Sequence, residues 1–211
     1  DVISGEVMTI EAVIEAGDPE DRLRKARSLL QGAKFGEAAE VCSEILADLP
    51  QHQEALYTLA VAQRFGGDAI AALSTLASLI DLSPSYGRAW QERGHCFRAL
   101  GRSEEAFAAY QAAVTHNGAL TASWRMLGEL HRAAGRDAQA EFAIAQANYL
   151  AGLPPELQTV ASLIQEGRIA RAEKFCRAFL QKNGHHVEGM RLLAEIGTRF
   201  NAFDEAEFLL E

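Results

Sequence analysis

The same residue types recur along this chain at a spacing of 34 residues. The positions in this register are Ala38, Ala72, Ala106 and Ala140; Leu56, Trp90 and Trp124; Gly101 and Gly135; and Pro50 and Pro84. A period of this length predicts a tandem array of similar units, each too small to bury its apolar face alone. Stacking of neighbouring units would then build one continuous core.

The unit best defined by the sequence runs from Arg88 to Gly118 and contains two amphipathic patterns. Small and aromatic residues lie at helical spacing in both of them: Trp90, Gly94 and Phe97 in the first, and Ala106, Tyr110 and Ala113 in the second. Gly101 lies between the two, where a residue without Cβ turns the chain at the lowest cost. We therefore expect a hairpin of two closely packed helices, with Trp90 and Trp124 largely buried.

This pattern resembles the tetratricopeptide repeat (TPR), although Arg93 stands where that repeat has Leu. The resemblance implies an all-α fold, a TPR α-solenoid in which antiparallel helix pairs stack into a right-handed superhelix. Four units would occupy residues 19–152, and a fifth and a truncated sixth unit would occupy residues 153–211. The step shortens to 32 residues between Ala140 and Ala172, and Pro154-Pro155 lies at this joint. Because two prolines disfavour helix, we expect a turn there, with two stacks meeting at a bend.

The two ends of the chain carry separate expectations. Residues 1–18 form an N-terminal leader, which is either a short helix capped by Thr9 or a disordered acidic segment. The sixth unit stops within its expected second helix, whose apolar residues are unlike the polar face of a terminal repeat. We expect the natural chain to continue past Glu211, and this end to self-associate or fray through residues 208–210.

The composition argues against several classes of protein. A net charge of −9 and a pI near 5.2 disfavour an undirected nucleic-acid binder. The longest apolar stretch, residues 69–80, is too short to cross a membrane, and no targeting segment is recognisable. Cys42, Cys96 and Cys176 form no CxxC pair and lie within helical patterns, which favours buried reduced thiols and a cytoplasmic location.

No motif for catalysis or cofactor binding occurs in the sequence. It contains no phosphate-binding loop, no nucleophile elbow, no HExxH and no paired CxxC. His185 and His186 occupy a polar turn with no further ligand at metal-binding spacing, and His131 takes the place of a packing aromatic residue. We therefore predict no enzymatic activity, no cofactor and no metal for these residues.

In a TPR array the first helices of successive units line a concave groove that suits a partner protein or peptide. The side chains that the packing pattern leaves for this groove are Arg64; Arg88, Gln91, Glu92, His95 and Arg98; Arg125, Met126, Glu129 and Arg132; and Glu188, Arg191, Glu195 and Arg199. Arg64, Arg98 and Arg132 share one slot in three units, and their guanidinium groups would favour an acidic peptide. The alternative is that each arginine pairs with a neighbouring glutamate and stays solvated.

Several segments resemble a narrower group, the N-terminal TPR arrays of bacterial proteins in which the repeats precede a sulfotransferase domain. These segments are residues 93–101, 127–132, 190–196 and 204–211. The resemblance implies that the array presents a partner or substrate to such an enzyme, and it carries over no catalytic residue.

Two other TPR uses fit this sequence less well. The carboxylate clamp of chaperone-binding arrays needs Lys and Asn at slots that hold Leu23, Arg27, Thr58, Arg88 and Glu92. The Asn row of TPR-bearing glycosyltransferases is replaced here by Thr58, Glu92 and Met126. A structural spacer or dimerisation arm without a groove ligand is the remaining alternative to a binding module.

Overall fold

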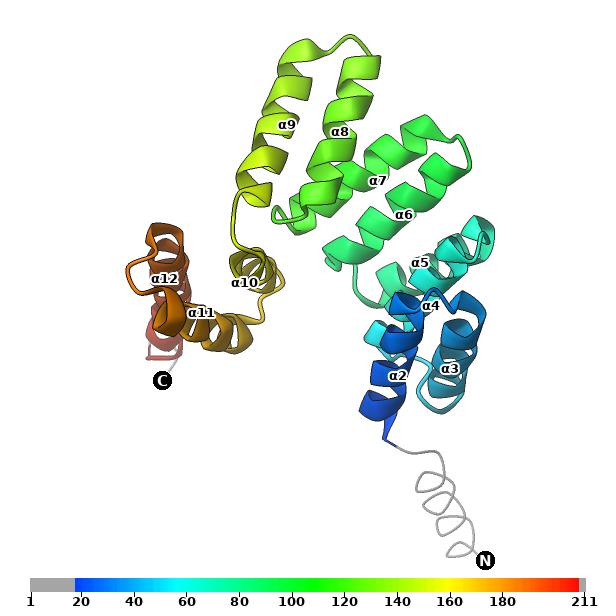
Figure 1. Cartoon of the computed structure of the whole chain (residues 1–211), viewed down its shortest axis with the longest axis horizontal. Helices are drawn as coiled ribbons and strands as arrows, with labels where there is room; N and C mark the ends of the chain where they lie inside the picture. The colour runs from blue at the N-terminus through cyan, green and yellow to red at the C-terminus, as the bar shows by residue number, and fades with distance from the viewer. Residues whose placement is uncertain (1–17, 209–211) are drawn as a thin grey trace, which may run out of the picture. The chain divides into compact units, whose positions relative to one another are not determined.

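The computed structural model describes residues 18–208, and the side chains of residues 18–200 (Figure 1). Every regular element in this part of the chain is an α-helix. In order they are α2 (Pro19–Gln31), α3 (Phe35–Asp48), α4 (Gln53–Phe65), α5 (Ala69–Leu82), α6 (Gly87–Ala99), α7 (Ser103–His116), α8 (Thr121–Ala133), α9 (Asp137–Ala151), α10 (Pro155–Gln165), α11 (Ile169–Asn183) and α12 (Val187–Phe208). The prediction of an all-α TPR α-solenoid is confirmed. The expectations for the N-terminal leader and for residues 209–211 fall outside the described residues.

The chain divides into two compact units, and the boundary runs through helix α6. Of the described residues, the first unit contains 18–84 and 95–101, and the second contains 85–94 and 102–208. A core cluster of the first unit consists of Leu23, Ala26, Val41, Cys42, Ile45 and Ala55. A cluster of the second unit joins α9 to α12 through Leu150, Leu157, Val160, Ile164, Cys176, Phe179, Leu192 and Ile196.

Side-chain caps mark where several helices begin. Asp18 accepts a hydrogen bond from the Glu20 backbone N–H at 3.0 Å, just before a proline at the first helical position. Asp68 caps α5 in the same way, accepting from the Ala71 N–H at 2.9 Å. These bonds satisfy first-turn N–H groups that have no partner within the helix.

The turns inside five helix pairs place a left-handed residue at one repeated position. These residues are Ala33 (φ 58°), Gly67 (φ 92°), Gly101 (φ 72°), Gly135 (φ 68°) and Gly167 (φ 71°). Glycine adopts this conformation without a steric penalty, because it has no Cβ. Among the described residues, Ala33 is the one non-glycine residue with a positive φ. The tight turn therefore belongs to this position of the repeat, and the first helix pair keeps the turn even though alanine stands there.

Small residues bring the two helices of a pair together, as the sequence predicts. A Cβ added to Gly94 would lie 2.6 Å from Cε1 of Tyr110, and one added to Gly128 would lie 2.6 Å from Cγ1 of Ile144. Trp90 and Trp124 are only half-buried, however, so the expectation that they are largely buried is too strong. Trp124 lies at the edge of its pair, where its indole N–H donates to the Gly118 carbonyl oxygen at 2.9 Å.

The joint between α9 and α10 is shorter than the sequence suggests. Pro155 is the first residue of α10 and does not belong to the turn. A proline is tolerated there because the first turn of a helix leaves its N–H groups without intrahelical partners. Gly152, Leu153 and Pro154 therefore form the whole connection.

Helix α12 continues without a turn to Phe208, and it replaces the helix pair expected for the sixth unit. The slot that holds glycine at positions 101, 135 and 167 holds Asn201 here, and the backbone stays helical through it. Without a residue in the left-handed conformation, the chain has no reason to reverse at this point.

The three cysteines are buried and free, as predicted. Burial raises the pKa of Cys42 to about 12. Within residues 18–208, no helix is both long and apolar enough to cross a membrane.

Candidate partner-binding site

Most of the predicted groove residues lie on α4, α6 and α8, the first helices of three successive pairs, and the others lie on α12. We call the side chains on these helices the first-helix surface, and its two parts belong to different units. Arg64, His95 and Arg98 are in the first unit. Arg88, Gln91, Glu92, Arg125, Glu129 and Arg132 are in the second.

In the first unit, two arginines lie close enough to one imidazole to change its protonation. Burial, and after it the positive charges of Arg64 and Arg98, together lower the pKa of His95 to about 4. His95 is therefore neutral near pH 7, because protonation would add a third positive charge to the pair. The Arg64 guanidinium also lies 4.0 Å from the centroid of the Phe65 ring, a cation–π contact. Arg64, His95 and Arg98 thus form a cluster at the ends of α4 and α6.

In the second unit, the predicted residues of α6 make internal contacts. Arg88 Nε lies 3.2 Å from Oε1 of Glu166, and the same guanidinium donates to the Tyr86 hydroxyl at 2.8 Å. Gln91 accepts a hydrogen bond from the Ser123 hydroxyl at 3.0 Å. Glu92 is buried, with 6% of its surface exposed. These three side chains therefore hold α6 in place and offer little to a ligand.

The predicted residues of α8 are different, because they face solvent. Arg125, Glu129 and Arg132 are all exposed. Neither Arg125 nor Arg132 forms an ion pair with any described residue. They are seven residues apart on one helix, so their Cα atoms lie roughly 10 Å apart along its axis. Two separated carboxylates of an extended peptide would match that spacing.

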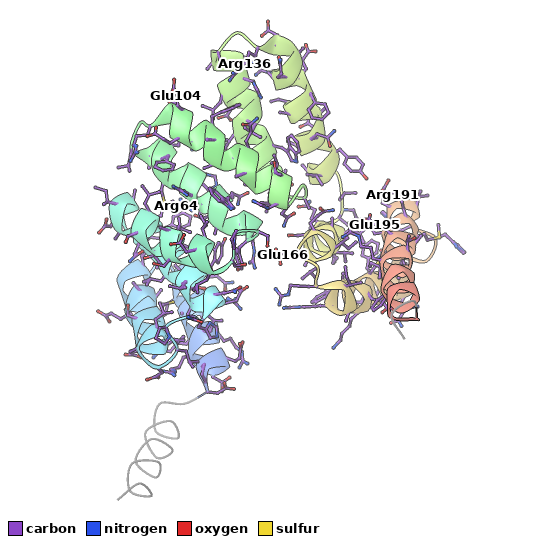
Figure 2. The ribbon with its side chains drawn as sticks, turned by 180° about the vertical axis from the view of Figure 1, so that it is seen from behind. Arg64, Glu104, Arg136, Glu166, Arg191 and Glu195 are labelled. Carbon is purple, nitrogen blue, oxygen red and sulfur yellow. The ribbon has the colours of Figure 1, made fainter. Side chains whose placement is uncertain are left out.

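Sequence reasoning missed Glu166, the residue that organises the internal contacts of the second unit (Figure 2). Its carboxylate accepts from the Ser162 hydroxyl at 3.3 Å, and Ser162 in turn accepts from the Asn117 amide at 2.9 Å. Arg88 and Arg168 lie 3.2 and 3.7 Å from its oxygens. Asn117 is almost fully buried, and a Cβ on Gly87 would meet its Cβ at 2.7 Å. Asn117 and the glycine opposite it, Gly87, are the sequence features that could have indicated the contact between Asn117 and Ser162.

The charged residues predicted on α12 neutralise one another. Arg191 lies 2.7 Å from Glu188 and 3.6 Å from Glu195, and Arg199 lies 3.1 Å from Glu195 (Figure 2). The hydrogen bond that Arg191 donates to Glu188 lowers the pKa of Glu188 and raises the pKa of Arg191. For these residues the solvated alternative describes the structure better than a ligand site.

The histidine pair of the α11–α12 turn contributes to packing. His186 Nδ1 accepts a hydrogen bond from the Gly189 N–H at 3.3 Å, and its ring meets Phe179 edge-on at 5.1 Å. No group of three or more His, Cys, Asp or Glu side chains within the described residues could hold a metal ion.

The comparisons with known proteins agree with this geometry. Residues 62–120 match a family model described as a tetratricopeptide repeat. No curated protein matches the chain.

Several solved structures share the fold at low sequence identity. The structure of TTC0263, a thermophilic TPR protein of Thermus thermophilus, is 21% identical, with a TM-score of 0.58, covering 85% of this chain and 98% of that one. PilF of Pseudomonas aeruginosa is 19% identical, with a TM-score of 0.58, covering 92% of this chain and 88% of that one. MamA is 19% identical, with a TM-score of 0.56, covering 63% of this chain and 78% of that one. The chain thus has the fold of a tetratricopeptide-repeat α-solenoid, and residues 62–120 also carry the sequence pattern of that repeat.

Proposed function

We propose that the first-helix surface binds an acidic segment of a partner protein, with its carboxylates on arginines such as Arg64 and Arg98. The observation that supports this most directly is the cluster in the first unit. Two guanidinium groups there are near enough to His95 to disfavour its protonation. A carboxylate entering beside them would accept charge-assisted hydrogen bonds from the guanidinium groups.

Solenoids of stacked helix pairs commonly serve as binding surfaces, which also supports this function. Their stacked units form extended concave surfaces that serve in binding, and the fold is not typically enzymatic. In the second unit, Arg125 and Arg132 add two exposed guanidinium groups with no ion-pair partner among the described residues. Arg88 takes no part in the proposal, since Glu166 already lies against it.

An interaction of this kind depends on exposed charges and is therefore modest and sensitive to salt. Exposed charges are screened over about 8–10 Å near physiological ionic strength. The acidic chain as a whole, with a net charge of −9, also opposes an acidic ligand except where arginines are concentrated. We expect the cluster to select extended peptides that are rich in carboxylates.

A direct test measures the binding of a fluorescein-labelled peptide of alternating Asp and Ala residues by fluorescence anisotropy. Arg64→Ala and Arg98→Ala, both in the first unit, should each weaken binding, and the double variant by roughly tenfold or more, as charge-assisted bonds are lost. Arg177→Ala is the matched control, because it removes the same charge from an exposed site on α11. Equal binding by parent, double variant and control at low salt would support the alternative of a structural spacer.

The resemblance to arrays that precede a sulfotransferase domain supports a further proposal, that the surface presents a partner or substrate to such an enzyme. The chain has no nucleotide-binding motif of its own. Titration calorimetry with a sulfate-donor nucleotide should therefore detect no binding to these 211 residues. Measurable binding would refute this division of roles.

A further inference from the structure

Helix α7 has a side that no other helix of its unit covers completely. Two cavities lie along it, one of about 430 Å³ and one of about 540 Å³. From α7, Ser103, Glu104 and Phe107 line the larger cavity, and Gln111, Val114 and Thr115 line the smaller one. We call this side of α7 with its two cavities the α7 groove. None of the arginines proposed above to bind an acidic segment lines either cavity, so this inference is independent of that function.

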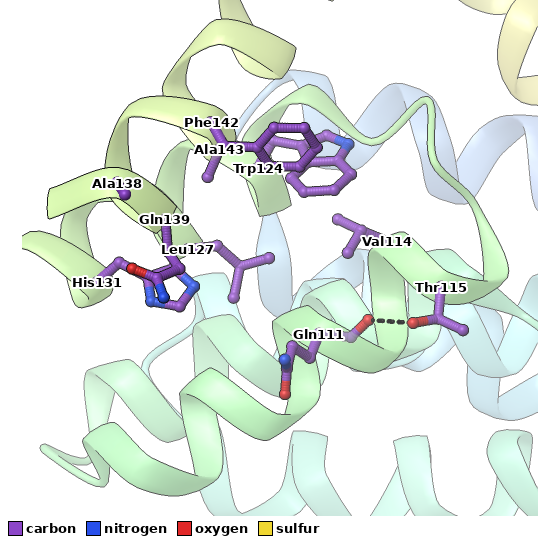
Figure 3. A pocket seen from close by; sticks show the side chains of 10 residues that line it. All are labelled: Gln111, Val114, Thr115, Trp124, Leu127, His131, Ala138, Gln139, Phe142 and Ala143. Carbon is purple, nitrogen blue, oxygen red and sulfur yellow. Dashed lines mark hydrogen bonds between the residues drawn. The ribbon is translucent and has the colours of Figure 1, made fainter. Parts of the chain in front are cut away.

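The smaller cavity has aromatic walls (Figure 3). Trp124 of α8 and Phe142 of α9 meet edge-on, with ring centroids 5.9 Å apart. Phe142 is 59% exposed, although it lies beside the apolar side chains of Val114 and Leu127. An apolar group that entered this cavity would cover the exposed aromatic surface, and burial of such surface drives association.

An aromatic ridge separates the two cavities. The rings of Phe107 and His131 meet edge-on at 5.0 Å, and the Arg136 guanidinium lies 4.9 Å from the Phe107 centroid. His131 Nδ1 is buried and has no hydrogen-bond partner among the described residues. Burial, and after it the charge of Arg136, lowers the pKa of His131, so the ring stays neutral at pH 7. The His131 and Phe107 rings of this ridge are therefore both uncharged, and the positive charge beside them belongs to Arg136.

The spacing of the cavities indicates what kind of ligand could fill both. Phe107 of the larger cavity and Val114 of the smaller one are seven residues apart on the same helix. At 1.5 Å per residue, this places the two cavities about 10 Å apart along the axis of α7. A second helix lying along α7 would present side chains at that distance from positions seven residues apart, the spacing used when amphipathic helices bind grooves. A compact small molecule would fill one cavity and leave the other empty.

The charged side chains around the larger cavity indicate which charge the ligand would carry. Glu104 lines the larger cavity, is exposed, and forms no ion pair with a described residue (Figure 2). Arg136 lines the same cavity but stacks on Phe107. Because the chain also carries a net charge of −9, its field favours the approach of a basic segment.

We propose that the α7 groove binds an amphipathic helix of a partner protein. Two apolar anchors of that helix, seven residues apart, enter the two cavities, and a neighbouring Lys or Arg faces Glu104. The anchor in the smaller cavity is aromatic, since it packs against Trp124 and Phe142.

The probe for this proposal is a fluorescein-labelled helical peptide of about 18 residues, long enough for some five turns. It carries Phe and Leu seven positions apart, with Lys beside the Leu, on a background of Ala, Gln and Lys. A second peptide of identical composition has the Leu moved by two positions, which puts the anchors on different faces of the helix. Anisotropy titration measures affinity. Because neither peptide contains tryptophan, the emission comes from Trp90 and Trp124 of the protein, and Trp90→Phe leaves Trp124, which lines the smaller cavity, as the single reporter.

Variants of exposed residues test each part of the groove. Ala138→Arg narrows the smaller cavity from the first turn of α9, and Ala145→Arg is its control at an exposed position of α9 outside both cavities. Glu104→Lys reverses the rim charge, and Glu141→Lys is its control. We expect Ala138→Arg to weaken binding by about tenfold or more, as for blocked anchor pockets, and Glu104→Lys by a few-fold at low salt. The control variants and the moved-Leu peptide show whether a loss of binding is specific to the groove. Circular-dichroism melts establish that each variant folds.

Two results would overturn the proposal. In the first, the parent protein binds the two peptides equally or binds neither. In the second, sedimentation shows that the protein associates with itself and that Ala138→Arg, unlike Ala145→Arg, abolishes this, which would make a second copy of the chain the occupant.

Discussion

Gly94 lies directly against the ring of Tyr110. A Cβ at position 94 would approach three ring atoms to within 2.6–2.9 Å, and the Tyr110 side chain is completely buried. The ring therefore cannot move aside without disturbing the core around it, since interiors are close-packed. This contact sets how closely α6 and α7 approach each other.

Gly94→Ala should accordingly destabilise the protein, by about 1–3 kcal/mol as for other overpacked core sites. The measurement is the free energy of unfolding in urea. Gly36→Ala is the control, because an added Cβ there meets nothing within 4 Å. That change should be neutral or slightly stabilising, since alanine is the better helix former. An equal loss in both variants would mean that the contact with Tyr110 is not the cause.

Ala33→Gly should stabilise the protein. Alanine with a φ of 58° is strained, whereas the other pairs have glycine at the same slot. Relief of the left-handed strain is worth about 1–2 kcal/mol, and the added freedom of glycine in the unfolded chain offsets up to about 1 kcal/mol of it. We expect a higher melting temperature for Ala33→Gly and a lower one for Gly135→Ala, which makes the opposite change at φ 68°. A lower melting temperature for Ala33→Gly would refute the strain.

The lowered pKa of His95 should make stability depend on pH. Its pKa is about 4 in the folded protein, against an ordinary value of 6.5. Between these values the unfolded chain binds a proton that the folded protein does not, so the free energy of unfolding falls as the pH falls from about 6.5 to about 4. The loss reaches about 3 kcal/mol at most, at 1.36 kcal/mol per pKa unit. Above pH 6.5 this contribution is fully present.

Comparison of the parent with His95→Gln isolates this contribution, because the carboxylates of the two proteins titrate alike. Urea unfolding at pH 4.5, 5.5, 6.5 and 7.5 should show a difference between the two proteins that narrows or reverses toward low pH. Parallel profiles over the whole range would contradict the assignment to His95.

Glu166→Ala should destabilise the second unit, because it leaves Arg88 half-buried without its carboxylate partner. Buried ion pairs broken on one side lose about 3–5 kcal/mol, and partial exposure should reduce this to about 2 kcal/mol. A double-mutant cycle with Arg88→Ala measures the coupling between the two residues. Glu173→Ala, which breaks an exposed pair with Arg177, should cost under about 1 kcal/mol. Additive effects of Glu166→Ala and Arg88→Ala would show that the pair contributes nothing.

Much of this architecture was determined by the sequence itself. The 34-residue register of alanines, glycines and tryptophans predicted helix pairs, their tight turns and the contact of small residues with Tyr110. These features depend on residues a few positions apart in a helix, or on identical slots in neighbouring repeats, so they have a periodic signal. The exposed arginines of α8 were found for the same reason, because the packing positions of a repeat define the ones left over.

Only the tertiary structure decided which charged groups meet. Ser162 and Glu166 lie at the end of α10, whereas Asn117 follows α7, and the three share no slot of the repeat. Their hydrogen bonds nevertheless connect them, and Glu166 lies against Arg88. The continuation of α12 through Asn201 and the incomplete cover of α7 were also invisible in the repeat pattern. Contacts of this kind depend on how successive pairs are rotated and on which side chains then come within a few ångströms of each other. That geometry is a sum over many packing interactions, and no single spacing in the sequence records it.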